Sequence, residues 1–237
     1  MRPALKYLLF FFLMATIFSC HRDEGPAPDL GYGYFPDAVG KYVIYDVDSF
    51  VQDDPAGIDT VYKMQVKEMV ESIYNDNQNR PTMRIERYKK FYNPSVPYSA
   101  MNWTFKDVWS ANVTKTTAEK VEEGVRFVKL IFPVKESATW NGNAQNTLGQ
   151  QDYKYIDVDM FTTVGASSFD STLTVLQTDK ENLIEKQYYQ EMYARNTWMI
   201  YKKIIDVKSK TITGANIMNR ITSGLICTMV YNSSGYQ

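Results

Sequence analysis

Apolar and polar residues alternate with a period of two along most of the chain, from Tyr34 to the C-terminus. Within residues 62–67, for example, every second residue is apolar and the residues between them are Lys, Gln and Lys. Successive side chains of a β-strand point to opposite faces, so this pattern predicts strands with one buried and one solvated face. The segments that carry it, or that are apolar on both faces, are residues 43–47, 62–67, 83–88, 101–109, 125–132, 153–160, 172–177, 183–193, 198–207 and 224–231.

Clusters of Asp, Asn, Gly and Pro separate these segments, as is typical of tight turns, at residues 53–57, 75–79, 141–143 and 179–182. The one helical candidate, residues 116–123, is short. Because strands follow one another without intervening helices, we expect a mainly β fold with antiparallel pairing. About ten strands would form a curved sheet, a half-barrel or a two-sheet sandwich, with at most one or two short helices. No repeat or second linker divides residues 34–237, which are expected to form one domain.

The N-terminus has the layout of a bacterial signal peptide. Two basic residues precede residues 7–18, an uncharged run that is too short to span a bilayer and right for the apolar part of a signal peptide. The run ends in Ile-Phe-Ser-Cys at residues 17–20, which resembles the lipobox of bacterial lipoproteins. The resemblance implies removal of residues 1–19, acylation of Cys20 and attachment to the membrane through several acyl chains.

Residues 20–33 combine Pro, Gly and charged side chains, so we expect them to form a flexible tether. Asp23 and Glu24 follow Cys20 closely and resemble the export signal that places lipoproteins of the Bacteroidetes on the cell surface. A solvated linker with two acidic residues is the alternative. The thiol that remains after acylation, Cys227, lies in an apolar run and is interpreted as a small core residue.

Three short segments of the expected domain resemble one family. They are residues 34–45, with Tyr-Phe-Pro, Gly and Tyr; residues 132–143, with Phe-Pro and Trp-Asn-Gly-Asn; and residues 191–202, with Glu-x-Tyr-Ala and Tyr-Lys. They are similar to segments of an uncharacterised family of membrane-anchored lipoproteins of the Bacteroidetes, although Thr197 and Trp198 stand where the family has Val-Gly. That family has no established activity, so the resemblance implies an envelope location and supplies no catalytic residue.

The composition of the chain excludes several kinds of catalytic site, metal site and partner. The chain has 237 residues, of which 26 are basic and 27 acidic, and this balance argues against nucleic acid as a partner. The only histidine, His21, lies in the expected tether, so the domain cannot build a Ser-His-Asp site or a His-ligated zinc site. Two cysteines leave no disulfide framework. We therefore expect no cofactor and no bound metal.

Paired carboxylates are the remaining catalytic option, since glycoside hydrolysis needs no histidine. Asp157 and Asp159 would share a strand face, and Glu185 and Glu191 are another pair. With 27 acidic residues such pairs arise by chance, and solvated strand faces explain the same residues. Three aspartates within residues 53–59 could offer oxygen ligands to calcium, but their spacing does not match an EF-hand loop and an acidic hairpin tip is the favoured interpretation.

Trp103, Trp109 and Trp140 are the candidate ligand-binding residues. Tryptophan offers a broad apolar face with a polar handle, which suits sugar stacking or a protein interface. Trp103 and Trp109 are expected on one side of a strand, where core packing is the alternative. Trp140 lies in a polar segment rich in Gly and Asn and is expected to be exposed.

Together these observations predict a non-catalytic protein of the bacterial cell envelope, lipid-anchored to the outer membrane through Cys20. Its ligand is expected to be a glycan, a lipid or another envelope protein. The alternatives are an accessory glycan-processing enzyme that uses paired carboxylates and a structural subunit of an outer-membrane complex.

Overall fold

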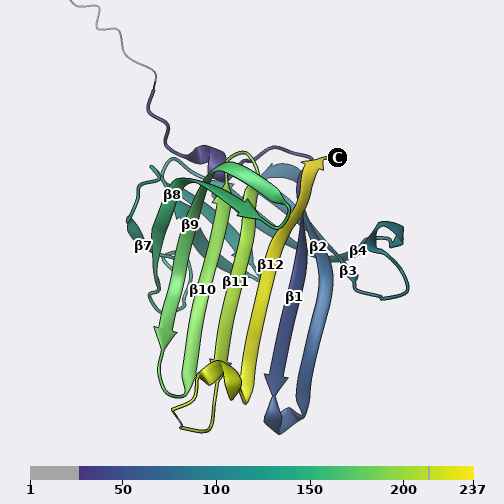
Figure 1. Cartoon of the computed structure of the whole chain (residues 1–237). Helices are drawn as coiled ribbons and strands as arrows, with labels where there is room; N and C mark the ends of the chain where they lie inside the picture. The colour runs from purple at the N-terminus through teal and green to yellow at the C-terminus, as the bar shows by residue number, and fades with distance from the viewer. Residues whose placement is uncertain (1–26, 213) are drawn as a thin grey trace, which may run out of the picture.

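The structure, a computed structural model, describes residues 27–212 and 214–237. Twelve strands form one sheet in the order β6-β5-β4-β3-β2-β1-β12-β11-β10-β9-β8-β7, and every neighbouring pair is antiparallel. The strands are β1 (Lys41–Asp53), β2 (Ile58–Asn75), β3 (Pro81–Phe91), β4 (Thr104–Val113), β5 (Thr117–Glu122), β6 (Val125–Ile131), β7 (Thr139–Asn141), β8 (Asp152–Val164), β9 (Ser167–Glu181), β10 (Glu185–Ala194), β11 (Trp198–Lys208) and β12 (Ser223–Tyr236). Two six-stranded meanders are thus joined where β12 pairs with β1 (Figure 1).

The alternating pattern forms strands because one face of the sheet turns inward. On β1, Val43, Tyr45 and Val47 are buried, whereas the residues between them are more exposed. The turn clusters close the hairpins as expected. At the β1–β2 connection Gly57 adopts φ 66°, and at the β2–β3 connection the Asp76 carboxylate accepts backbone N–H bonds from Gln78 and Arg80.

The sheet curves until its two end strands approach each other. The amide of Val128 on β6 donates to the carbonyl of Gly142, just after β7, at 2.8 Å. The indole N–H of Trp140 on β7 donates to the Val128 carbonyl, also at 2.8 Å. These bonds make a seam between β6 and β7, so the sheet is nearly closed and barrel-like.

The N-terminal segment closes one end of the curved sheet, the upper end in Figure 1. A short 3₁₀-helix, η2 (Tyr32–Tyr34), buries Tyr34 completely, and Phe35 packs edge-on against the Trp198 ring. The Tyr34 hydroxyl donates to Asp159 at 2.6 Å, and the Asn196 amide donates to the Gly33 carbonyl at 2.7 Å. The expected tether of residues 20–33 therefore ends earlier than predicted, because its last residues pack on the sheet.

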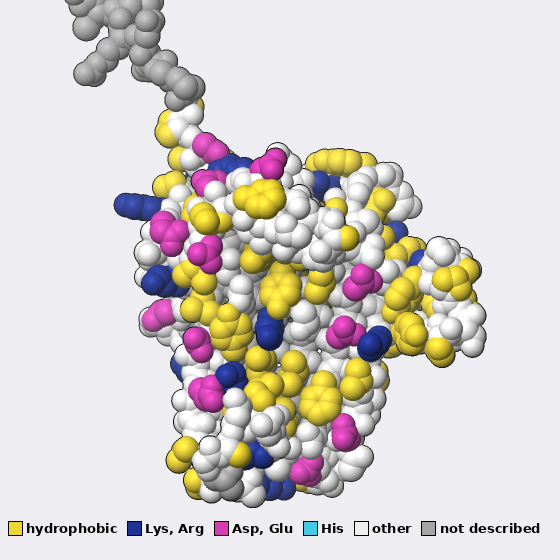
Figure 2. Space-filling view, viewed as in Figure 1, with side chains coloured by type: hydrophobic (Ala, Val, Ile, Leu, Met, Phe, Trp, Pro, Cys, Tyr) yellow, Lys and Arg dark blue, Asp and Glu magenta, His cyan; other side chains and the backbone are white. Residues whose placement is uncertain are grey.

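The opposite end is open. Strands β9–β12, β1 and β2 extend well below the level at which β3–β8 lie behind them (Figure 1). Figure 2 shows the outer face of these long strands, on which charged side chains of both signs are scattered among apolar ones. The sheet therefore has an upper part that is closed on both sides and a lower part in which only the long strands are present.

The predicted fold class is confirmed: the described chain is mainly antiparallel β, in one strongly curved sheet with twelve strands rather than ten. The helix predicted at residues 116–123 is wrong. Residues 117–122 form β5, whose ladder partners are β4 and β6 on either side. Its Lys120 and Glu122 point inward and find ionic partners there, which offsets part of the cost of burying their charges.

The expected signal peptide (residues 1–19), Cys20 and His21 lie outside the described residues. Within the described part of the chain, no helix has the length and apolar character needed to cross a membrane.

Candidate functional site

Charged side chains from six strands meet inside the sheet, where an apolar core would be expected. We call this group the charge layer. It lies beneath the aromatic residues of the closed end, and four of its residues line the small gap below Phe35 and Trp198. Its members are Glu68 on β2, Arg87 on β3, Lys120 and Glu122 on β5, Lys129 on β6, Glu191 on β10 and Lys202 on β11.

One half of the charge layer is centred on Glu68, which is 2% exposed. Its carboxylate accepts from the Nε of Arg87 at 3.0 Å and from the Nζ of Lys120 at 2.7 Å. Trp109 forms the wall beside them: the guanidinium of Arg87 lies 3.4 Å from its ring centroid and the Lys120 ammonium 4.7 Å. Burial works against ionisation of Glu68, but the two cations outweigh it and lower its pKa.

The other half is a square of two lysines and two glutamates. Glu191 lies 2.7 Å from Lys129 and 3.0 Å from Lys202, while Glu122 lies 3.2 Å and 3.6 Å from the same two ammonium groups. The Tyr193 hydroxyl donates to the second oxygen of Glu191 at 2.7 Å. Burial alone would raise the pKa of Glu191, but the lysines hold it at about 2. All four groups are therefore charged near neutral pH.

A cavity of about 250 Å³ opens on the lower side of this square. Lys129, Lys202 and Glu122 form its polar end, and its remaining lining comes from Phe127, Gln151, Tyr153, Gln177, Tyr189 and Ile204. A water molecule needs only about 10–15 Å³, so the cavity has room for a small ligand or several waters. It lies just below the size of about 300 Å³ at which small-molecule sites commonly begin.

One polar group of the cavity wall has no hydrogen-bond partner among the described residues. Gln177 is only 7% exposed, and its side-chain nitrogen is buried without a hydrogen-bond partner. A buried amide without a partner costs about 1–3 kcal/mol, so the cavity wall favours an occupant that accepts a hydrogen bond.

A β-bulge lies at Gln177. The pairing of β9 with β10 shifts register between Leu176 and Thr178, which leaves Gln177 as the extra residue on β9. Regular alternation already places Gln177 on the same inner face as Val175, two positions earlier, and the bulge brings Thr178 opposite Tyr189 beside it. The neighbouring Tyr189 is fixed in the wall because its hydroxyl donates to Asp206 at 2.8 Å.

The structure corrects the prediction for Trp140. Its side chain is not exposed: the residue is 9% exposed, its N–H is bonded at the seam, and its ring lies 4.5 Å from the Tyr155 ring centroid. The polar residues that follow it, Asn141 and Asn143, build the turn itself, since the Asn141 side chain accepts from the Asn143 amide at 3.0 Å. Trp140 does not line the cavity.

Trp103 and Trp109 do not share a face as predicted. The pairing of β3 with β4 shifts register at Lys106, so that Asp107 faces Arg87 but Phe105 faces Tyr88. The bulge separates the two tryptophans. Trp109 turns inward to the charge layer, whereas Trp103 stacks outside under Lys90 at 4.2 Å and Lys67 at 5.5 Å.

Neither predicted carboxylate pair comes together as a catalytic pair. Asp157 and Asp159 both have positive φ within a bulge of β8, so they do not share a regular strand face, and Asp159 is bonded to Tyr34 and Arg195. Glu191 is completely buried, whereas Glu185 pairs with Lys208. The two glutamates are six residues apart on β10, which separates them by about 20 Å.

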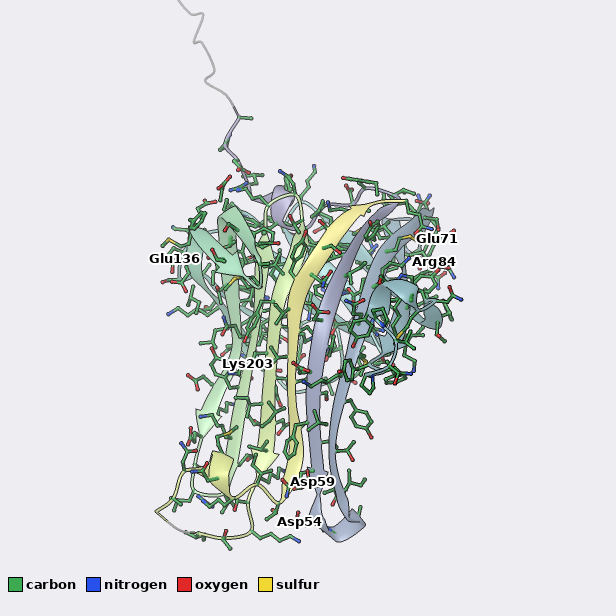
Figure 3. All side chains as sticks on the ribbon, turned by 45° about the vertical axis from the view of Figure 1, so that its right-hand side comes forward. Asp54, Asp59, Glu71, Arg84, Glu136 and Lys203 are labelled. Atoms are coloured by element: carbon green, nitrogen blue, oxygen red, sulfur yellow. The ribbon has the colours of Figure 1, made fainter. Side chains whose placement is uncertain are left out.

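The aspartates of the β1–β2 hairpin are not arranged as ligands of a metal ion. Asp54 and Asp59 are exposed at the tip of the β1–β2 hairpin, at the lower end of the long strands (Figure 3). Across residues 27–212 and 214–237, the structure brings together no group of three His, Cys, Asp or Glu side chains suited to an ion. Cys227 is half-buried on β12 and packs against the core, and burial raises the pKa of its thiol.

The residues of the charge layer, Glu191 apart, were not predicted from the sequence as site residues. Two features of the sequence are consistent with buried charges. Lys129 interrupts an otherwise apolar run on β6, and Lys202 lies at an inward position of β11, two residues after the buried Ile200. In a single strand, however, a charged residue at such a position is equally consistent with a face that contacts solvent. Only the closure of the sheet brings the opposite charges together.

No protein-family model matches the chain, and no characterised protein matches its sequence. Two solved structures are similar in fold, each covering 85% of this chain and 98% of its own, at 12% sequence identity. One is a candidate exported protein with a YmcC-like fold from Bacteroides fragilis (TM-score 0.39), and the other a candidate lipoprotein from Parabacteroides distasonis (TM-score 0.35). Both belong to the Bacteroidetes, the phylum of the lipoproteins that the sequence resembles. TM-scores this low say nothing about what the cavity binds.

Proposed function

We propose that the protein is a non-catalytic, lipid-anchored protein of the bacterial envelope that binds a sugar group of a glycan in its interior cavity. The anchor and the envelope location come from the lipobox-like N-terminus. The observation that carries the binding function is the unpaired Gln177 amide, which is buried in the cavity wall beside the square of lysines and glutamates.

The charge balance of the cavity favours a neutral, hydroxyl-rich ligand. Lys129 and Lys202 are matched by Glu122 and Glu191, so neither an anion nor a cation gains net attraction. A sugar ring carries hydroxyls that donate to Glu122 and accept from Lys202 or Gln177. Its apolar C–H face suits the aromatic rings of the wall, such as Phe127 and Tyr189.

The state of the glutamates supports binding rather than hydrolysis. Glycoside hydrolysis needs one carboxylic acid that is still protonated near neutral pH, which requires a raised pKa. Here the neighbouring lysines outweigh burial and lower the pKa of both Glu122 and Glu191. Neither residue is suited to act as the general acid.

The test is a thermal-shift and calorimetric screen of mono- and disaccharides against the chain from residue 21 onward, which contains all the described strands. A ligand at a hundred times its dissociation constant stabilises by about 2.7 kcal/mol, which raises the Tm by roughly 5–10 °C. We expect Gln177→Met to abolish the shift of the sugar that binds. Gln150→Met is the matched control, because Gln150 is exposed and bonds only Asp152. No shift with any sugar, or an unchanged shift in Gln177→Met, would contradict the proposal.

A further inference from the structure

A groove continues the cavity along the inner face of the long strands. It has a volume of about 540 Å³ and is lined in its apolar part by Val51, Ile58, Ile204 and Leu225, from β1, β2, β11 and β12. Ladder pairing places Val51 opposite Leu225 and Ile204 opposite Cys227, so these side chains share one face of the sheet. Because β3–β8 do not reach this level, nothing among the described elements covers that face (Figures 1 and 3).

The cavity and the groove meet at Ile204, which lines both. Along this path the lining changes in a definite order. The closed end holds the charged square and the unpaired Gln177 amide. The middle is mainly apolar, with the Asp206 carboxylate opposite Leu225 accepting from the Tyr189 hydroxyl, and the open lower end is polar again at Asp53 and Lys208. An occupant that matches this order has a compact polar head and an apolar chain.

We propose that the cavity and groove together bind a glycolipid, with its sugar in the cavity and its acyl chain along the groove. The sugar half of this assignment rests on the function proposed above. The chain half rests on the open apolar face, because an exposed apolar surface that adjoins a polar pocket favours an amphiphile over a free sugar. Half-buried side chains such as Leu225 and Cys227 would then lose their remaining contact with water.

The probes are methyl β-D-glucoside and methyl β-D-galactoside, each compared with its hexyl and octyl homologue below the critical micelle concentration. Each methylene group that becomes buried strengthens binding, so the octyl glycosides are expected to bind at least about tenfold more tightly than the methyl glycosides. Leu225→Ser and Ile58→Ser should remove most of that advantage and leave methyl-glycoside affinity unchanged. Val61→Ser is the matched control, since Val61 is 59% exposed on the same strand as Ile58 and lines neither space.

The outcomes separate the two proposals. If methyl and octyl glycosides bind equally, or if the groove variants leave octyl affinity unchanged, the groove assignment is overturned while the sugar site stands. If octyl glycosides bind and Gln177→Met has no effect on them, the chain site stands without the sugar site and the glycolipid is excluded. If no alkyl glycoside binds, or if sedimentation shows a dimer that Leu225→Ser dissociates, the groove has another occupant and the proposal fails.

Discussion

The ammonium group of Lys129 lies 2.7 Å from the carboxylate of Glu191, although the two residues are 62 positions apart and stand on strands that are not neighbours in the sheet. Lys129 is on β6, at one end of the strand order, and Glu191 is on β10, beyond the seam. The pair therefore spans the interior. It forms only when the sheet has curved nearly to closure, and it links the two halves of the fold.

Removing this link should be costly. In Glu191→Gln, Lys129 and Lys202 keep their charges but lose the carboxylate they share, and breaking a buried pair typically costs about 3–5 kcal/mol. We expect urea denaturation to show a loss of that size in the free energy of unfolding. Glu181→Gln is the control: its pair with Lys186 is on the surface, where ion pairs contribute up to about 1 kcal/mol. Equal losses in the two variants would refute a structural role of the charge layer.

The same carboxylates predict the response to acid. The pKa of Glu191 is held at about 2 in the folded protein and those of Glu68 and Glu122 are also lowered, against a usual value of 4.5. Folded-state pKa values below the unfolded ones give stability that is present above about pH 5 and is lost as the pH falls toward 2. Urea midpoints measured between pH 7 and pH 3 should fall with the pH, and the fall should be smaller in Glu191→Gln. A wild-type midpoint that stays level down to pH 3 would contradict this account.

The seam can be tested with a pair of glycines. A Cβ on Gly142 would lie 2.3–2.5 Å from atoms of the Tyr153 ring, whereas a Cβ on Gly149 would meet nothing within 4 Å. Gly142→Ala should therefore push Tyr153 from its place and destabilise the fold by about 1–3 kcal/mol. Gly149→Ala, in the same connection, should leave the Tm nearly unchanged. If both variants melt like the wild type, the close packing at the seam is incorrect.

The period-two pattern was enough to predict a mainly antiparallel β fold because most inward positions are apolar, as on β1. It misassigned β5, whose inward Lys120 and Glu122 imitate the polar face of a short helix. Strand alternation also cannot show where a bulge falls. The bulge at Lys106 separates Trp103 from Trp109.

The candidate site was harder to predict for a related reason. A charged residue on a strand is normally solvated, and Lys129, Lys202 and Glu122 differ only in having partners on distant strands. Their pairing follows from the order and closure of the sheet, which local sequence does not encode. Trp140 is the opposite case, a residue that was predicted to be exposed and is buried. The Asn and Gly residues beside it form the turn and do not indicate that the tryptophan is exposed.

Trp140 itself gives the last prediction. Its N–H satisfies the Val128 carbonyl at the seam, and its ring packs against those of Tyr153 and Tyr155. Trp140→Phe keeps most of the ring packing but leaves that carbonyl without its side-chain donor, at a cost of about 1–3 kcal/mol. The loss should appear in urea denaturation and as faster hydrogen exchange of the Val128 amide, which bonds across the same seam.

Trp103→Phe provides the comparison, because Trp103 stacks under lysines on the outer face and touches neither the seam nor the cavity. Its exchange at Val128 should match the wild type. If instead Trp140→Phe leaves stability and exchange unchanged, the Trp140 N–H does not hold the two end strands together. A stable seam in that variant would place the closure of the sheet on the Val128–Gly142 backbone bond alone.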